Sequence, residues 1–330
     1  MFSLLALAVA LTQGPPAPAL AVRVDSSRHI VLLEYRIPAA TPADHGDHGA
    51  HGAHAGHIET MSRFAWPVDG WVRGARVEVL GTDGAPLPQR RLHHVNLINF
   101  ARRQLVHSGV ERLWGAGQET DPVMLPAGVG VPVAAGTAMG LVAAWVPSDL
   151  GAGSRIRIAI RWSPANTVPR PVDVIPVSFT VNFKQAATSA YDLPPGQSEQ
   201  VLEFVMPASG RMLGVGGHLH DYGIAIRLEN AESGEVLVRL ETERDSAGRL
   251  IRVPQRLFGV SGRGKPLERG KRYRVVATYD NPTGALLVAG GMASLGVGFV
   301  PDRGARLPAT DPRDPAVARD IAYLHAMERR

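Results

Sequence analysis

Glycine and proline interrupt this chain so often that its apolar segments are of strand length almost to the C-terminus. The 330 residues include 36 Gly and 26 Pro, and Asp-Gly pairs at 69–70 and 83–84 mark tight turns between apolar segments. Residues 155–162, RIRIAIRW, alternate basic and apolar side chains with a period of two. That alternation is typical of a strand with one solvated face. The sequence therefore predicts an all-β protein.

The length of the chain predicts two domains. A chain of 330 residues exceeds one ordinary β-sandwich, and residues 184–197, KQAATSAYDLPPGQ, lose apolar periodicity and gain turn residues. We predict an N-terminal β-sandwich over 22–185, a C-terminal β-sandwich over 193–301 and a tail over 302–330. In the tail, Asp314 as N-cap and Pro315 at the first helical position predict a short C-terminal helix.

The N-terminal segment has the pattern of a secretory signal. An apolar stretch of about ten residues is followed by Gly-Pro-Pro at 14–16 and by the small-x-small site Ala-Leu-Ala at 19–21. We therefore predict a signal peptide over 1–21 and a periplasmic or secreted protein. Elsewhere the sequence lacks the ~20 consecutive apolar residues of a membrane span, so no membrane span is expected.

Charge and composition narrow the classes of function. The formal charge is +5, but the arginines are scattered and form no continuous basic stripe, so we expect no nucleic-acid partner. The absence of Cys rules out disulfides, thiolate nucleophiles and blue-copper sites, which leaves Met as the one soft metal ligand. We expect a monomer.

Two histidines in GGHLHDYG, residues 216–223, are separated by one residue. Strand residues i and i+2 project from the same face, so His218 and His220 can hold one metal ion without backbone distortion. The alternative is a pair of solvent-facing histidines on an edge strand. Met292 alone would be core filler, but a thioether beside imidazoles favours Cu(I) and lets a site change oxidation state.

A second histidine pair, His93 and His94, is adjacent in the sequence. Adjacent strand residues point to opposite faces, so joint metal binding requires a β-bulge or a strand end there. The alternative is that one histidine packs and the other is exposed. A His-rich loop is predicted over 44–57, because its Gly content opposes a helix, and it could store copper or zinc independently. Its histidines recur at a strict period of three: His45, His48, His51, His54 and His57.

A series of segments, taken in order, resembles one family of enzymes. They are HHVNLINF at 93–100, LPAGVGVPV at 125–133, LPPGQSEQVLEFVMP at 193–207, GGHLHDYG at 216–223, YDNP at 279–282 and GGMASLGVGFVP at 290–301. The chain is similar to the copper type II, ascorbate-dependent monooxygenases, the group of peptidylglycine α-hydroxylating monooxygenase and dopamine β-monooxygenase. The resemblance implies two tandem jelly-roll-like β-sandwich domains, each offering a copper site to a solvent-filled cleft between them.

The resemblance also assigns ligands in the second domain. There the family's oxygen-binding copper is held by a His-x-His pair and a Met, which match His218, His220 and Met292 of this chain. These residues would form one tight copper site and would be the catalytic set.

In the first domain the resemblance implies an electron-transfer copper held by an adjacent His pair and a later third His. The pair matches His93 and His94. The third is missing, because Trp145 or Val146 stands at the matching place. This second site is therefore incomplete unless His107 or the His-rich loop supplies a ligand.

The function implied by the resemblance is a copper-dependent monooxygenase that activates dioxygen and hydroxylates a C–H bond, with electrons from ascorbate or another reductant. The alternative is a non-catalytic periplasmic copper-binding, storage or delivery protein, which the His-rich loop and the missing third histidine favour. A third reading is a secreted structural or carbohydrate-contacting sandwich. The sequence does not identify the substrate, which would be a small molecule or a peptide.

Overall fold

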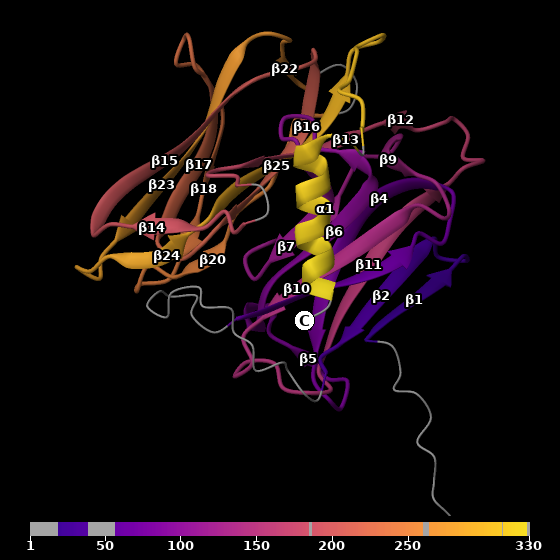
Figure 1. Ribbon diagram of the computed structural model, residues 1–330, viewed down its shortest axis with the longest axis horizontal. Helices are drawn as coiled ribbons and strands as arrows, with labels where there is room; N and C mark the ends of the chain where they lie inside the picture. The colour runs from indigo at the N-terminus through magenta and orange to yellow at the C-terminus, as the bar shows by residue number, and fades with distance from the viewer. Residues whose placement is uncertain (1–18, 39–56, 185–186, 260–263, 312, 329–330) are drawn as a thin grey trace, which may run out of the picture.

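A computed structural model describes residues 19–38, 57–184, 187–259, 264–311 and 313–328. It confirms the predicted all-β class: two jelly-roll-like sandwiches lie side by side, and one helix packs on the first of them (Figure 1). Among the described residues the strand pairs are antiparallel apart from one short parallel pair, between β9 (Val129–Val133) and β12 (Val172–Asp173).

The first sandwich consists of two sheets. One sheet has the order β1 (Leu20–Asp25), β2 (Ile30–Arg36), β11 (Arg155–Pro164), β4 (Gly70–Leu80), β9 (Val129–Val133) and β12 (Val172–Asp173), with β5 (Pro86–Leu87) and β8 (Val123–Met124) on β4. The other has the order β3 (Ile58–Ala65), β10 (Ala138–Trp145), β6 (Leu92–Arg103) and β7 (Val110–Gly117), and a 3-10 turn, Gln89–Arg91, precedes β6.

The second sandwich also has two main sheets. One has the order β13 (Ile175–Thr180), β25 (Ala293–Pro301), β16 (Gly210–Leu219) and β21 (Arg256–Leu257), with β22 (Lys265–Leu267) on β16. The other has the order β15 (Gly196–Val205), β23 (Arg272–Asn281), β17 (Gly223–Asn230) and β18 (Val236–Glu241). Two short pairs complete it: β14 (Tyr191–Leu193) with β24 (Leu287–Gly291), and β19 (Glu243–Arg244) with β20 (Leu250–Arg252).

Strand β11 shows why the alternating pattern folds as it does. Ile156, Ile158 and Ile160 are buried in the core of the first sandwich, whereas Arg157 between them pairs with Glu34 on the outer face at 2.9 Å. A period of two sends every second side chain to the same face, so the apolar set is buried by one strand orientation. The predicted half-solvated strand is thus confirmed.

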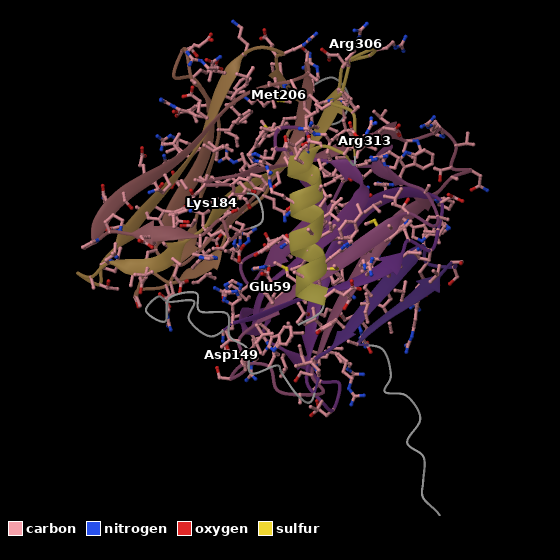
Figure 2. The ribbon with its side chains drawn as sticks, viewed as in Figure 1. Glu59, Asp149, Lys184, Met206, Arg306 and Arg313 are labelled. Carbon is pink, nitrogen blue, oxygen red and sulfur yellow. The ribbon has the colours of Figure 1, made fainter. Side chains whose placement is uncertain are left out.

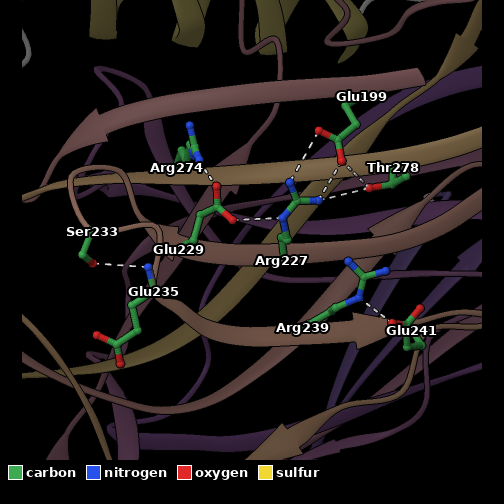
Figure 3. A network of polar contacts seen from close by, with 9 residues as sticks. All are labelled: Glu199, Arg227, Glu229, Ser233, Glu235, Arg239, Glu241, Arg274 and Thr278. Atoms are coloured by element: carbon green, nitrogen blue, oxygen red, sulfur yellow. Dashed lines mark hydrogen bonds and ion pairs between the residues drawn. The ribbon is translucent and has the colours of Figure 1, made fainter. Parts of the chain in front are cut away.

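The outer face of the second sandwich carries a network of paired charges beside exposed apolar side chains such as Val201 and Val205. Arg227 donates to Glu199 at 2.8 Å and to Glu229 at 3.0 Å, and Arg274 also pairs with Glu229 (Figure 3). Glu229 is 3% exposed, so the two arginines compensate its charge where water is largely excluded. The network thus satisfies the charges of this sheet, and the apolar cores hold the fold.

The chain passes between the two sandwiches earlier than its composition change suggests. β13 lies within the predicted first domain, yet it pairs along its length with β25 of the second sandwich, from Ile175 opposite Phe299 to Thr180 opposite Ser294. Val177 and Phe179 belong to the second core. The predicted domain bounds stay a prediction, and this pairing shows that residues 175–180 pack with the second sandwich.

The predicted C-terminal helix is present as α1 (Pro315–Glu328). The Asp314 side chain accepts a hydrogen bond from the backbone N–H of Ala316 at 2.8 Å, as an N-cap does. Val317, Leu324 and Met327 pack against the first sandwich. None of the helices in the described ranges is long and apolar enough to cross a membrane. Residues 1–18 of the predicted signal lie outside the described residues, and β1 begins at Leu20.

Candidate functional site

The predicted ligands of the second sandwich come together where β16 ends. The backbone N–H of His220 donates to the carbonyl oxygen of Met292 at 3.2 Å, so these two residues face each other across neighbouring strands. The rings of His218 and His220 have centroids 5.3 Å apart. All three residues line one cavity. The i and i+2 spacing thus places both imidazoles on one face beside Met292.

The backbone at Met292 is held in place by hydrogen bonds from buried tyrosines. The Tyr279 hydroxyl donates to the carbonyl oxygen of Met292 at 2.5 Å, and Tyr191 donates to the Tyr279 hydroxyl at 3.2 Å. Burial raises the pKa of Tyr279 far above its ordinary value, so it stays a neutral donor. Met292 therefore sits on a fixed hydrogen-bonded support that originates in the core.

The histidine pair of the first sandwich lies at a β-bulge, as its joint use requires. Ala144 of β10 is opposite His94 and Trp145 is opposite Leu92, so His93 is the extra residue. The Nδ1 atoms of His93 and His94 are 2.8 Å apart. Two nitrogens that share one ion at right angles are about 3 Å apart, so this spacing fits a common metal.

At the place of the missing third histidine, Trp145 packs into the core, and His57 and Glu59 contact the histidine pair instead. Trp145 is fully buried in the first core. The ring of His57, just before β3, stacks on His93 with centroids 4.5 Å apart. Glu59 accepts a hydrogen bond from Nε2 of His94 at 3.0 Å, near where the two sandwiches meet (Figure 2). Although burial raises the pKa of Glu59, the hydrogen bond and charge of His94 lower it below its usual range.

Of the two proposed sources of a third ligand, one lies beside the histidine pair and the other does not. His57 belongs to the predicted His-rich loop and reaches the histidine pair, whereas residues 44–56 lie outside the described residues. His107 lies elsewhere, stacked on Phe183 with centroids 4.4 Å apart. Burial lowers the pKa of His107 to about 4, so its ring is neutral near pH 7.

The two histidine pairs contact each other across the junction of the sandwiches. Ring centroids lie 5.5 Å apart for His93 and His220 and 6.4 Å apart for His94 and His218. The resemblance implies copper sites facing each other across a solvent-filled cleft, and here the imidazoles form one continuous cluster. The cluster borders a cavity of 460 Å³ lined by both sandwiches.

One carboxylate that sequence reasoning missed completes the cluster. Glu119 follows β7 in the first sandwich, and its Oε1 accepts a hydrogen bond from Nδ1 of His218 at 2.7 Å. The Glu119 side chain is 1% exposed. Burial pulls the pKa of His218 down, but the charge and hydrogen bond of Glu119 outweigh it and raise that pKa above its ordinary value. A lone Glu in a polar turn carries no pattern that would have singled it out.

The turn that carries Glu119 also joins the sandwiches. The backbone carbonyl oxygen of Glu119 accepts a hydrogen bond from the N–H of Val253 at 3.2 Å. Two residues further on, Asp121 pairs with Arg252 at 2.6 Å and accepts from Gln255 through its backbone carbonyl at 2.9 Å. These contacts explain why the histidine pairs touch, because the turn holds the second sandwich against the first.

Within the described residues, no three His, Cys, Asp or Glu side chains form a group that could hold a metal ion. The set of His218, His220 and Met292 consists of two imidazoles and one thioether. Neutral imidazole and thioether are the donors that suit copper. Since Nδ1 of His218 is bonded to Glu119, its Nε2 is the nitrogen left for a metal.

No family model and no curated protein matches this chain. Among solved structures, it is similar to the major capsid protein P2 from bacteriophage PM2, with a TM-score of 0.37 and 12% identity over 77% of this chain and 99% of that one. It is also similar to PNGase F, a glycosylasparaginase from Flavobacterium meningosepticum, with a TM-score of 0.35 and 10% identity over 82% and 96%. At these scores the likenesses carry no argument about function.

Proposed function

We propose that this protein is a copper-dependent monooxygenase that hydroxylates a C–H bond beside His218, His220 and Met292. The observation that carries the proposal is the convergence of these three side chains on one wall of a cavity large enough for a small molecule. Copper held there would supply the activation of dioxygen. The chain itself supplies the imidazole and thioether donors, the orientation of His218 by Glu119 and the fixed backbone at Met292.

The histidine pair of the first sandwich is the proposed point where ascorbate or another reductant delivers electrons. The 2.8 Å spacing of the His93 and His94 Nδ1 atoms supports a shared metal ion, and their rings contact those of the second pair. We also propose that the protein works in the periplasm or outside the cell, on the basis of the signal pattern over residues 1–21.

A second candidate function is copper storage or delivery without turnover. It is favoured by the position of His57, which connects the predicted His-rich loop directly to His93. A carrier needs a path along which an ion passes between weak and tight sites. A loop with histidines that ends on the cluster would provide one.

The copper content of the full-length protein tests the site. His45, His48, His51 and His54 are first replaced by Asn, so that only the cluster can bind. We expect one tight copper per chain, lost in His218→Ala/His220→Ala and retained in His93→Ala/His94→Ala. The exposed His29, in a turn at the far side of the first sandwich, is the control as His29→Asn. Copper retained by His218→Ala/His220→Ala would overturn the assignment.

A further inference from the structure

The wall of the cavity next to the histidines is nearly free of side chains. Residues of β16 and β25 alternate between this wall and the core, so the residues facing the cavity are those of one parity. Val215, Leu219, Leu295 and Val297 lie in the second core. The cavity face holds the cross-strand pairs His218 with Ser294, Gly216 with Gly296, and Gly214 with Gly298.

Three of these glycines are not required by the fold. Gly216, Gly296 and Gly298 have no positive φ. A Cβ placed on them would meet its nearest neighbour at 3.5, 3.7 and 3.5 Å, which is ordinary van der Waals contact. Glycine inside a strand is less stable than alanine and often marks close approach of a ligand. The missing methyl groups therefore keep the cavity open and serve no packing need.

The flat floor continues onto β13. Pro176, Ser178 and Thr180 are the direct partners of Gly298, Gly296 and Ser294, and they line the same cavity. The hydroxyl oxygens of Ser178 and Thr180 are 3.0 Å apart and hydrogen-bond to each other. Small residues thus cover the floor over three neighbouring strands, beginning at His218. We call this surface the glycine floor.

The carboxylate that lines the cavity is already committed. Glu59 is the one carboxylate among the described lining residues, and it bonds to His94 at 3.0 Å. Arg112 makes two bonds to Asp320 at 2.5 and 3.0 Å, and Arg73 donates to the carbonyl oxygens of Leu125 and Pro126 at 3.3 and 2.9 Å. A cationic ligand entering this cavity would therefore lose its hydration without gaining an uncommitted carboxylate.

The remaining wall is mainly apolar and has two open donors. Leu125, Val131 and Val174 line the cavity together with Trp114. The indole Nε1 of Trp114 and the Nε of Arg73 are buried and have no hydrogen-bond acceptor within the described part of the chain. Buried donors are satisfied as a rule, so acceptor atoms on a ligand are the partners that these N–H groups call for.

We propose that the cavity binds a flat, mainly apolar small molecule without a positive charge, which lies on the glycine floor and offers an acceptor atom to Trp114. As the substrate class of the site, the inference rests on the proposed function. As a binding site, it requires no metal. The volume of 460 Å³ lies within the range of roughly 300–1,000 Å³ that small-molecule pockets occupy.

Binding of a neutral fluorescent probe to the metal-free protein tests the proposal. N-Phenyl-1-naphthylamine is titrated, and we expect saturable binding that is weakened about tenfold or more in Gly296→Val, because the added side chain occupies the floor. Gly298→Ala, whose methyl group meets only van der Waals contacts, should weaken it about threefold with an unchanged melting temperature. The control is Gly151→Val, an exposed glycine with nothing within 4 Å of its Cβ.

Displacement of the probe tests the charge requirement. Methyl 2-naphthoate should displace it about tenfold more tightly than 2-naphthylmethylammonium, because the ammonium ion finds no uncommitted carboxylate. The inference is overturned if metal-free protein shows no saturable binding, if both floor variants bind like wild type, or if the ammonium ion binds as well as the ester. Copper content is measured in parallel. Loss of probe binding with copper retained overturns this inference alone, whereas probe binding without a copper site supports it and counts against the monooxygenase.

Discussion

The carboxylate of Glu119 in the first sandwich accepts a hydrogen bond from Nδ1 of His218 in the second, over 2.7 Å. The two residues are separated by 99 positions in the sequence. A carboxylate on one ring nitrogen sets the tautomer and the orientation of the imidazole, which leaves the other nitrogen for a metal. The same contact spans the junction of the sandwiches, so the shape of the metal site depends on how they dock.

Glu119→Gln should weaken copper binding at His218 by about 10- to 100-fold, the usual effect of removing a carboxylate that orients a metal-bound histidine. Competition with a chromophoric Cu(I) chelator measures the affinity. The EPR spectrum of the Cu(II) form should change as well, because the ring loses its fixed orientation. The matched control is Glu203→Gln, which removes an exposed pair with Arg272 within the second sandwich and leaves the histidine untouched. Equal affinity and spectra in both variants would contradict a positioning role.

Met292→His should keep or strengthen Cu(II) binding and abolish copper-dependent oxygen uptake driven by ascorbate. Imidazole is a good Cu(II) ligand, but it lacks the preference for Cu(I) that the soft thioether provides. An oxygen electrode measures uptake, and His218→Ala/His220→Ala gives the background of unbound copper. A carrier would show no uptake above that background in the wild type, so this result would favour storage or delivery.

Glu111→Gln should make the protein less sensitive to rising pH. Glu111 is 1% exposed, and burial raises its pKa to about 7, although the charge of Arg102 and a hydrogen bond from Asn99 lower it. An acid whose folded-state pKa is raised stabilises the fold fully below the unfolded value of 4.5, and this stability is lost as pH rises through about 7. Between about pH 5 and about pH 8, the wild type should lose roughly 2 kcal/mol relative to the variant.

Urea unfolding at both pH values measures this difference. Glu241→Gln serves as the control, since Glu241 is exposed and its pair with Arg239 lies in solvent. A free energy of unfolding that changes equally with pH in the wild type and in Glu111→Gln would show that Glu111 is not held protonated.

Asp320→Ala should destabilise the protein by about 3 kcal/mol, because it leaves buried donors without an acceptor. Asp320 on α1 accepts from the backbone N–H of Val110 at 2.8 Å and from both terminal nitrogens of Arg112. Arg112 is 24% exposed, which keeps the expected cost at the low end of the range for a buried pair. Asp311→Ala, at an exposed pair with Arg313, should change stability by less than about 0.5 kcal/mol. Chemical unfolding compares the two, and equal effects would mean that α1 is not anchored here.

The parts of this protein that the sequence determined by itself are those that depend on neighbours along the chain. The isoleucines of β11 are buried because a period of two places them on one face, and α1 begins after Asp314 because an N-cap acts within one turn. The same local rule places His218 and His220 on one face. The bulge at His93 was a stated requirement for joint use of the pair, and the register with β10 shows it.

Only the tertiary structure decided which groups surround those histidines. Glu119 and Glu59 reach them from strands and turns far away in the sequence, and Trp145 is buried in the core at the place matched to a ligand. Such contacts follow from docking two sandwiches through many small apolar and polar interactions, and no local pattern encodes the result. A lone Glu, or a glycine in a strand, acquires its role only from what lies opposite it in space. For this reason the sequence indicated the donor set, whereas the contact between the histidine pairs and the open floor beside them emerged from the fold.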